Sequence, residues 1–158
     1  MKIIYKTKVS DIIPSTIDEG KGQIIDGYAK FKINNIIFWA FVSEDWRMGN
    51  WSLSNKGKTV SVSFSFVCTN LEKWHKKEKK ITPQTKRKKP CDYILTGKII
   101  GKSPFESIHE ENRKKFEMID VDCGFVVRMT AKKGGFGIGD FIGAEGRLDA
   151  RKESGDKK

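Results

Sequence analysis

The sequence predicts an all-β fold with one short helix. Apolar and polar side chains alternate between Val60 and Thr69, a period of two that is typical of a strand with one buried face. Residues 27–33 alternate in the same way and are followed by Asn34-Asn35, a pair that tolerates the positive φ of a tight turn. The apolar run Ile36–Val42 comes next, and its length predicts a strand buried on both faces.

The second half of the chain carries further strand signals. Cys123-Gly124 predicts a tight turn between the middle two of four expected strands, and the glycines between Gly134 and Gly139 predict a loop before the last one. The expected strands are Tyr93–Ile100, Phe116–Cys123, Phe125–Ala131 and Phe141–Ala150.

The expected helix lies near residues 104–115. Ser103 is a typical N-cap residue, Pro104 suits the first helical position, and Glu106 stands where a capping box places its carboxylate. Glu110 and Lys114 are spaced as an i,i+4 ion pair, as are Glu111 and Lys115. We therefore expect a helix over Pro104–Lys115.

The length and composition favour a cytoplasmic, reducing environment. A chain of 158 residues has the size of one domain or of two small ones. The longest apolar run has seven residues, whereas a membrane-spanning helix needs about 20, and the N-terminus shows no secretory signal. The three widely spaced cysteines do not resemble a disulfide framework.

Most of the positive charge lies in one segment. Residues 73–89 contain nine Lys or Arg and one Glu, and so carry +8 of the net charge of +11. The segment has no apolar periodicity, which predicts a linker or a long loop with little order of its own. The expected organisation is an N-terminal β unit (1–72), the basic segment (73–91), a C-terminal β unit (92–150) and a charged tail (151–158).

Residues 94–149 contain several short motifs in a definite order. Leu95–Ile100 is a strand pattern, Asp122-Cys123-Gly124 is an acidic-glycine hairpin turn, and Gly139-Asp140 leads into a strand with an internal glycine. This order resembles that of an OB-fold domain, with Leu95–Ile100 similar to its first strand, so the C-terminal unit (92–150) is expected to be OB-like. The resemblance implies one OB-like barrel or two small OB-like β units, and implies binding of single strands through aromatic stacking in a basic groove. The alternative architecture is one eight-stranded sandwich or barrel with the basic segment as an excursion.

The candidate nucleic-acid-binding residues form two groups. The basic segment can neutralise phosphates and release counterions, and Trp74 beside it can stack on a base. The alternative is that the segment is a solvated linker and that Trp74 covers the end of a barrel. Tyr28, Lys30 and Lys32 share a strand face suited to stacking and phosphate contact; the alternative is an ordinary solvent face. The full set is Tyr28, Lys30, Lys32, Trp74, Lys76, Lys77, Lys79, Lys80, Lys86, Arg87, Lys88 and Lys89.

Other residue types give weaker indications. Trp39, Trp46 and Trp51 suit either a ligand pocket or ordinary packing. The cysteines and histidines lack the spacing of a zinc site, so we expect no metal and no cofactor. Asp120 and Asp122 share a strand face that could hold Mg²⁺ or perform acid–base chemistry, but aspartates beside a turn explain them as well.

Three functional classes follow from these observations. The first is a non-enzymatic protein that binds nucleic acid, single-stranded DNA or RNA, through the basic segment and aromatic strand faces. The second is a protein-interaction or assembly module built on a β-barrel, which has a protein partner and no catalytic residues. The third is an enzyme or small-ligand barrel, which the absence of a recognisable catalytic motif disfavours. No membrane partner is expected in any of them.

Overall fold

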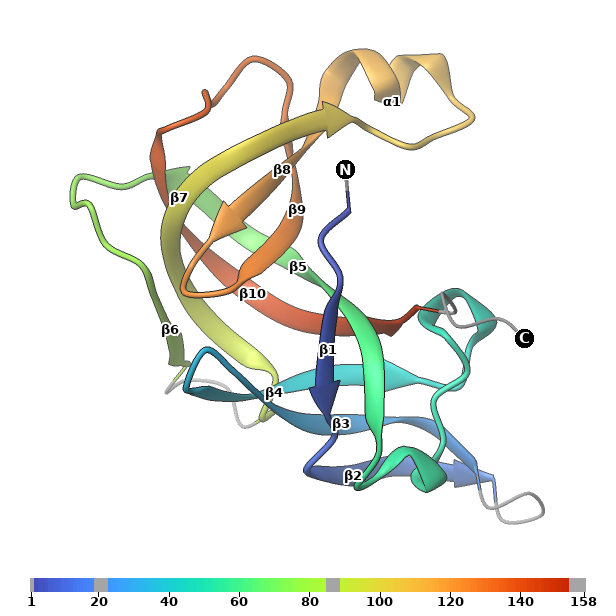
Figure 1. Cartoon of the computed structure of the whole chain (residues 1–158). Helices are drawn as coiled ribbons and strands as arrows, with labels where there is room; N and C mark the ends of the chain where they lie inside the picture. The colour runs from blue at the N-terminus through green and yellow to red at the C-terminus, as the bar shows by residue number, and fades with distance from the viewer. Residues whose placement is uncertain (1, 19–22, 85–88, 154–158) are drawn as a thin grey trace. The chain divides into compact units, whose positions relative to one another are not determined.

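The computed structural model describes residues 2–18, 23–84 and 89–153. Within these ranges the chain forms ten strands and one short α-helix, which confirms the all-β fold (Figure 1). The strands are β1 (Tyr5–Lys8), β2 (Asp11–Asp18), β3 (Gln23–Ile33), β4 (Ile36–Ser43), β5 (Thr59–Lys73), β6 (Lys80–Pro83), β7 (Asp92–Pro104), β8 (Phe116–Asp122), β9 (Val126–Lys132) and β10 (Phe141–Lys152). The helices are the 3₁₀ turns η1 (Trp46–Met48) and η2 (Leu53–Asn55) and the α-helix α1 (Glu110–Lys115).

The contacts divide the chain into two compact units that share the long strands β5 and β10. We call Phe66–Gln84 with Asp92–Arg147 the barrel unit, and Lys2–Ser65 with Lys89–Cys91 and Leu148–Glu153 the N-terminal unit. The domain limits expected from the sequence divide the chain at other residues than these two units do. They remain a prediction about which parts of the chain fold independently.

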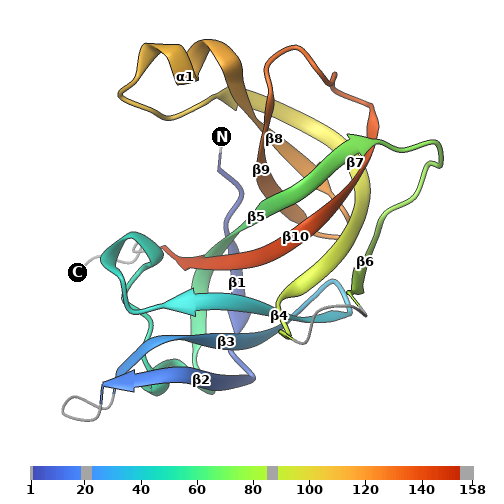
Figure 2. The ribbon, with the colours of Figure 1, turned by 180° about the vertical axis from the view of Figure 1, so that it is seen from behind.

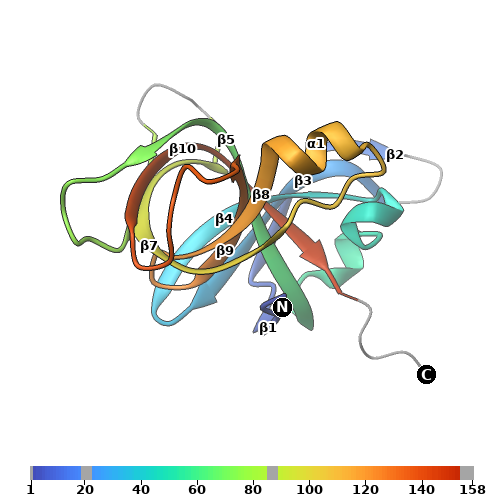
Figure 3. The same ribbon diagram turned by 90° about the horizontal axis from the view of Figure 1, so that it is seen from above.

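The barrel unit is a closed five-stranded barrel, as expected for an OB-like fold. Its strands follow the order β5–β9–β8–β7–β10, and pairing of β10 with β5 closes the ring (Figure 3). Closure depends on a glycine, because a Cβ on Gly146 would lie 2.1 Å from the carbonyl oxygen of Val67 on β5. The interior is filled by Leu95, Ile99, Val121 and similar side chains, all without exposed area.

The N-terminal unit contains an antiparallel meander. β2 pairs with β3, and β3 pairs with β4, so the three strands lie side by side (Figure 2). The expected hairpin is confirmed: Asn34 and Asn35 have φ of 51° and 66°, and Ile33 pairs with Ile36 across the turn. β1 pairs with the first half of β5, and the amide of Ser10 just after β1 donates to the carbonyl of Lys30 on β3.

An aromatic cluster forms the core of the N-terminal unit. Phe64 on β5 packs against Phe31 of β3 and Phe38 of β4, with ring centroids 5.4 and 5.2 Å apart. Phe31 also meets Trp51 at 6.0 Å. The expected alternation on β5 is confirmed, because Val62 and Phe64 are buried in this unit while Ser61 and Ser63 are partly exposed.

The helix prediction is partly wrong. Ser103 and Pro104 do not begin a helix but end β7, where they pair with Met118 and Glu117 of β8. The expected capping box therefore does not form, because the ladder with β8 holds this segment extended. The helix begins only at Glu110, and its expected ion pair with Lys114 is present at 3.8 Å.

The basic segment is more ordered than its composition predicts. β5 extends to Lys73, and Lys80–Pro83 forms β6, which pairs antiparallel with β7 (Figure 1). The Gln84 side-chain amide continues this attachment by donating to the carbonyl of Tyr93 at 2.9 Å. The backbone of the neighbouring barrel strand thus orders residues that lack an apolar face of their own.

Candidate functional site

The expected basic-aromatic stripe lies on β3. Ala29, Phe31 and Ile33 point into the core of the N-terminal unit and are almost fully buried. Because successive side chains of a strand point to opposite faces, Tyr28, Lys30 and Lys32 share the outer face. Lys32 is exposed, and Tyr28 and Lys30 are partly exposed.

Strand β4 adds three side chains to that outer face. The antiparallel register places Phe41 opposite Tyr28, Trp39 opposite Lys30, and Ile37 opposite Lys32. Directly opposed residues in an antiparallel pair project from the same face of the sheet. We call the six residues Tyr28, Lys30, Lys32, Ile37, Trp39 and Phe41 the aromatic face.

Ring and cation contacts organise the aromatic face. The Tyr28 and Phe41 rings meet edge to face, with centroids 6.5 Å apart. The Lys30 ammonium lies 5.8 Å from the centroid of the Trp39 ring, close enough for a cation–π interaction. The face thus presents aromatic rings and two ammonium groups on one sheet surface.

The strand β2 places one carboxylate at the edge of this face. Asp11 pairs in register with Lys30, but its carboxylate contacts the Lys56 ammonium at 3.3 Å. Hydrogen bonds from Lys56 and from the Ile12 amide lower the pKa of Asp11, so this side chain is ionised at neutral pH. Lys32 has no acidic residue opposite it in the register with β4, where its partner is Ile37.

Sequence reasoning missed the contribution of β4. The run Ile36–Val42 was expected to be buried on both faces, which is wrong: Phe38, Ala40 and Val42 are buried, but Ile37 is 60% exposed. The Asn34-Asn35 turn was the available signal. A two-residue turn fixes the register of a hairpin, and that register places residues 37, 39 and 41 beside the stripe of β3.

The second expected group lies on the barrel unit. Lys76, Lys77, Lys79 and Lys80 are exposed, and so is Lys89, which belongs to the N-terminal unit. Lys86, Arg87 and Lys88 lie outside the described residues. Trp74 is partly buried and packs against Gly143, at which an added Cβ would lie 2.8 Å from the indole. The Nε1 of Trp74 is buried, and no described residue forms a hydrogen bond with it.

The two aspartates near the β8–β9 turn are held in ion pairs. Asp120 binds the Arg128 guanidinium at 2.9 Å, and Asp122 binds the Lys79 ammonium at 2.9 Å. Burial opposes ionisation of Asp122, yet hydrogen bonds from Lys79 and the Gly124 amide bring its pKa below the usual value. Both pairings favour the structural explanation of these carboxylates.

The described residues show no grouping of three His, Cys, Asp or Glu side chains that could hold a metal ion. No helix in the same part of the chain is long and apolar enough to cross a bilayer. Cys68, Cys91 and Cys123 are not joined in disulfides. Burial raises the pKa of Cys68 to about 11 and the pKa of Cys123 to about 12.

These thiol pKa values predict slow alkylation of the native protein. The thiolate is the reacting species, so at pH 8 only about one Cys68 thiol in a thousand would be ionised, against roughly a quarter for an ordinary cysteine. We expect Cys68 to react with iodoacetamide far more slowly than in the urea-unfolded chain, and faster as the pH approaches 11. Mass spectrometry of timed samples measures both rates; equal rates at pH 8 would contradict the raised pKa.

No protein-family model matches the chain, and no curated protein matches it in sequence. The functional inference therefore depends on the geometry described above.

Proposed function

We propose that this protein binds single-stranded nucleic acid, without catalysis, through the aromatic face of β3 and β4. The observation that supports this most directly is the register, which sets Tyr28 beside Phe41 and Lys30 beside Trp39 on one outer sheet surface. Aromatic rings stack on unpaired bases, and neighbouring ammonium groups neutralise the phosphates between them. The OB-like barrel is consistent with this function, although a fold alone does not determine one.

The arrangement favours single strands over duplexes. Rings on a flat strand surface need bases whose faces are free, and in a duplex each base face already stacks on the next base pair. The exposed lysines of the basic segment, Lys76, Lys77, Lys79 and Lys80, add a sequence-independent attraction for phosphate. The proposal assigns base contact to the aromatic face and most of the non-specific charge to the basic segment.

A salt series tests the charge component of the proposal. Neutralising Lys30 and Lys32 together (Lys30→Gln/Lys32→Gln) removes two phosphate contacts, so the slope of log K against log salt should become shallower by about 1.4 for a single strand. Fluorescence anisotropy of labelled single-stranded and duplex oligonucleotides measures the slope. The wild-type protein should bind the single strand more tightly.

The matched control is Lys6→Gln/Lys8→Gln. These lysines are also exposed on a strand of the N-terminal unit, and their replacement changes the net charge by the same amount, but they lie on β1. We expect a smaller change in slope than for Lys30 and Lys32. If the wild-type protein shows no salt-dependent binding to either oligonucleotide at about 50 mM salt, where basic binders are strongest, the proposal is wrong.

One observation favours a second candidate, a protein-interaction module. Ile37 is 60% exposed on the aromatic face, and Ile13 of β2, in register with Tyr28, is 45% exposed. Apolar side chains grouped on a sheet surface also suit a protein partner. Ile37→Ser should abolish capture of such a partner, while it should change single-strand affinity much less than loss of an aromatic ring.

A further inference from the structure

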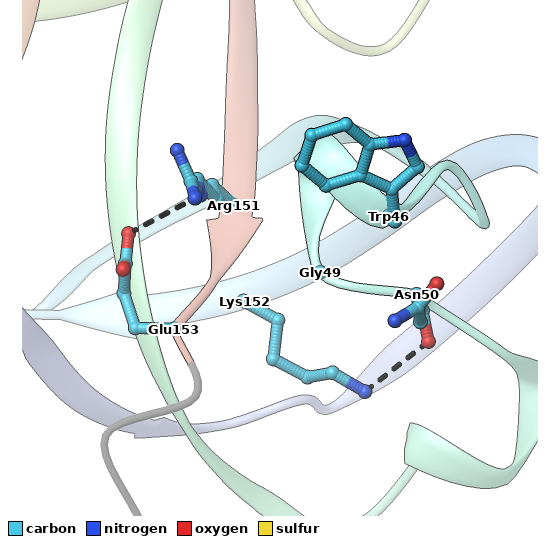
Figure 4. A pocket seen from close by; sticks show the side chains of 6 residues that line it. All are labelled: Trp46, Gly49, Asn50, Arg151, Lys152 and Glu153. Atoms are coloured by element: carbon cyan, nitrogen blue, oxygen red, sulfur yellow. Dashed lines mark hydrogen bonds and ion pairs between the residues drawn. The ribbon is translucent and has the colours of Figure 1, made fainter.

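A pocket of about 150 Å³ lies beyond the end of β4 in the N-terminal unit. Its walls come from two places in the chain, the turn around η1 and the end of β10 (Figure 4). The lining residues are Trp46, Gly49, Asn50, Arg151, Lys152 and Glu153. Of these residues the sequence singled out only Trp46, as suited to a ligand pocket or to ordinary packing, and the aromatic face includes none of them.

Trp46 is held at the surface instead of in the core. It is 74% exposed, whereas Trp51, five residues later, is fully buried and donates its Nε1 to the carbonyl of Ala150 at 3.1 Å. Asp45 fixes the turn that carries Trp46, because its carboxylate accepts bonds from the amide and the guanidinium of Arg47 at 2.9 and 2.8 Å. The exposed indole is thus presented by an ordered turn.

The opposite wall of the pocket is cationic. Figure 4 shows Arg151 and Trp46 on opposite sides, with Gly49 between them. Arg151 is held by Glu153 at 3.8 Å, a distance that leaves the pair loose. Gly49 is required at the base, because its φ is +95° and a Cβ would lie 2.2 Å from the carbonyl oxygen of Lys152. Glycine at this position therefore lets the turn around η1 pack directly against the backbone at the end of β10.

The ammonium of Lys152 adds positive charge, and no ion pair joins it to a carboxylate of the described residues. It donates to the carbonyl of Asn50 at 3.3 Å and to Oδ1 of Asn55 at 3.2 Å, both neutral acceptors, and lies 5.6 Å from the Trp51 ring. Burial and the nearby Lys58 lower the pKa of Lys152. Of the acidic groups nearby, Glu153 is shared between Lys2 and Arg151, and Asp45 is engaged by Arg47. An anion at this pocket would relieve the excess of positive charge.

We propose that this pocket binds a nucleotide, with its base stacked on Trp46 and its phosphate facing Arg151. The base would stack on the indole, whose ring centroid already has the Arg47 guanidinium 5.9 Å away, and the phosphate would gain an ion pair with Arg151. The inference deepens the proposed function, because it supplies a second stacking position for the strand bound by the aromatic face. The same chemistry could be offered by a base within a strand or by a free nucleotide.

One short chain segment connects the pocket to the aromatic face. Phe41 lies near the end of β4, and Trp46 follows five residues later in η1. Five residues span at most about 18 Å even when fully extended. This distance is compatible with one bound strand of several nucleotides that contacts both sites of the N-terminal unit.

The test uses NMR of the tryptophan indole N–H groups together with binding assays on the full chain. Trp46→Phe identifies the Trp46 resonance by its disappearance. We expect this resonance to shift when an oligonucleotide of about 12 nucleotides is added. Trp46→Ala should weaken oligonucleotide binding about five- to 150-fold, whereas Trp46→Phe should retain most of the affinity because a phenyl ring still stacks. Trp46 is exposed, so neither change should unfold the protein.

The outcomes separate this inference from the proposed function. UMP, a free mononucleotide, is titrated separately. If only the oligonucleotide shifts the Trp46 resonance, the pocket binds a base within a strand. If UMP shifts the resonance as well, the pocket also accepts a free mononucleotide. A shift with UMP but no oligonucleotide affinity supports the pocket and overturns the proposed function. The pocket inference is wrong if the oligonucleotide binds but neither the oligonucleotide nor UMP shifts the Trp46 resonance, and if Trp46→Ala binds the oligonucleotide as tightly as wild type. That result would leave the proposed role of the aromatic face intact.

Discussion

Replacing both Tyr28 and Trp39 by alanine is expected to weaken single-strand binding by about 2–6 kcal/mol, which is roughly 30-fold to 10⁴-fold. Each ring that stacks on a base contributes about 1–3 kcal/mol. Both rings lie on the outer surface of the N-terminal unit, so their removal leaves the Phe31, Phe38 and Phe64 cluster in place. Titration of a labelled oligonucleotide at one fixed salt concentration measures the loss.

The salt slope distinguishes stacking from charge in this experiment. The alanine pair keeps Lys30 and Lys32, so log K should fall by nearly the same amount at every salt concentration. Tyr28→Phe with Trp39→Phe is the matched control, because it keeps two aromatic faces and should retain most of the affinity. A double alanine variant that binds as wild type, while the lysine variant still changes the slope, would show that charge alone holds the strand.

The two single variants are also informative. Tyr28 contacts Phe41, and Lys30 contacts Trp39, so the four residues form two neighbouring cross-strand pairs. Side chains that touch usually show non-additive effects of about 0.5–3 kcal/mol, but Tyr28 and Trp39 belong to different pairs. If each ring holds a separate base, we expect the losses of binding free energy in Tyr28→Ala and Trp39→Ala to add up to the loss in the double variant.

Strand prediction succeeded where one face of a strand is buried. On β5, the alternation of Val62 and Phe64 with serine follows directly from one face in the core and one facing solvent. The Asn34-Asn35 turn was predictable for a local reason, because both residues take the positive φ that asparagine tolerates. These elements are encoded by a few neighbouring residues.

Prediction failed where distant backbone pairing determines the structure. Ser103 and Pro104 carry a local helix-start signal, but the β7–β8 ladder holds them extended. β6 has no apolar period that would identify it, and it forms because it pairs with β7. Local preferences of a few tenths to one kcal/mol are readily outweighed by a ladder of backbone hydrogen bonds and the packing behind it.

The candidate site shows the same division. Tyr28, Lys30 and Lys32 could be identified from the sequence because a period of two places them on one face. Trp39 and Phe41 required the hairpin register, since nothing in an uninterrupted apolar run says which of its side chains face outward. The contrast between exposed Trp46 and buried Trp51 was equally invisible, because it depends on how the turn around η1 meets the end of β10.

Phe64→Ala is expected to lower the free energy of unfolding by about 3–5 kcal/mol, because it removes the ring at the centre of the aromatic cluster. Phe64 is 3% exposed and contacts Phe31, Phe38 and Tyr5, whose centroid lies 6.2 Å away. Alanine would leave a cavity among rings that occupy fixed positions on three strands. For a chain of this size, the loss corresponds to a fall in Tm of about 6–20 °C.

The matched control for this change is Val67→Ala, also on β5. Val67 is 51% exposed, so its truncation should change stability by no more than about 0.5 kcal/mol. Urea unfolding followed by circular dichroism measures both variants.

Phe31 belongs to the same cluster and lies on the inner face of β3, directly behind the stripe of Tyr28, Lys30 and Lys32. We therefore expect Phe64→Ala to weaken oligonucleotide binding as well as stability, because a loosened β3 no longer holds those side chains in one plane. If Phe64→Ala is no more destabilising than Val67→Ala, the aromatic cluster is not what supports the binding surface.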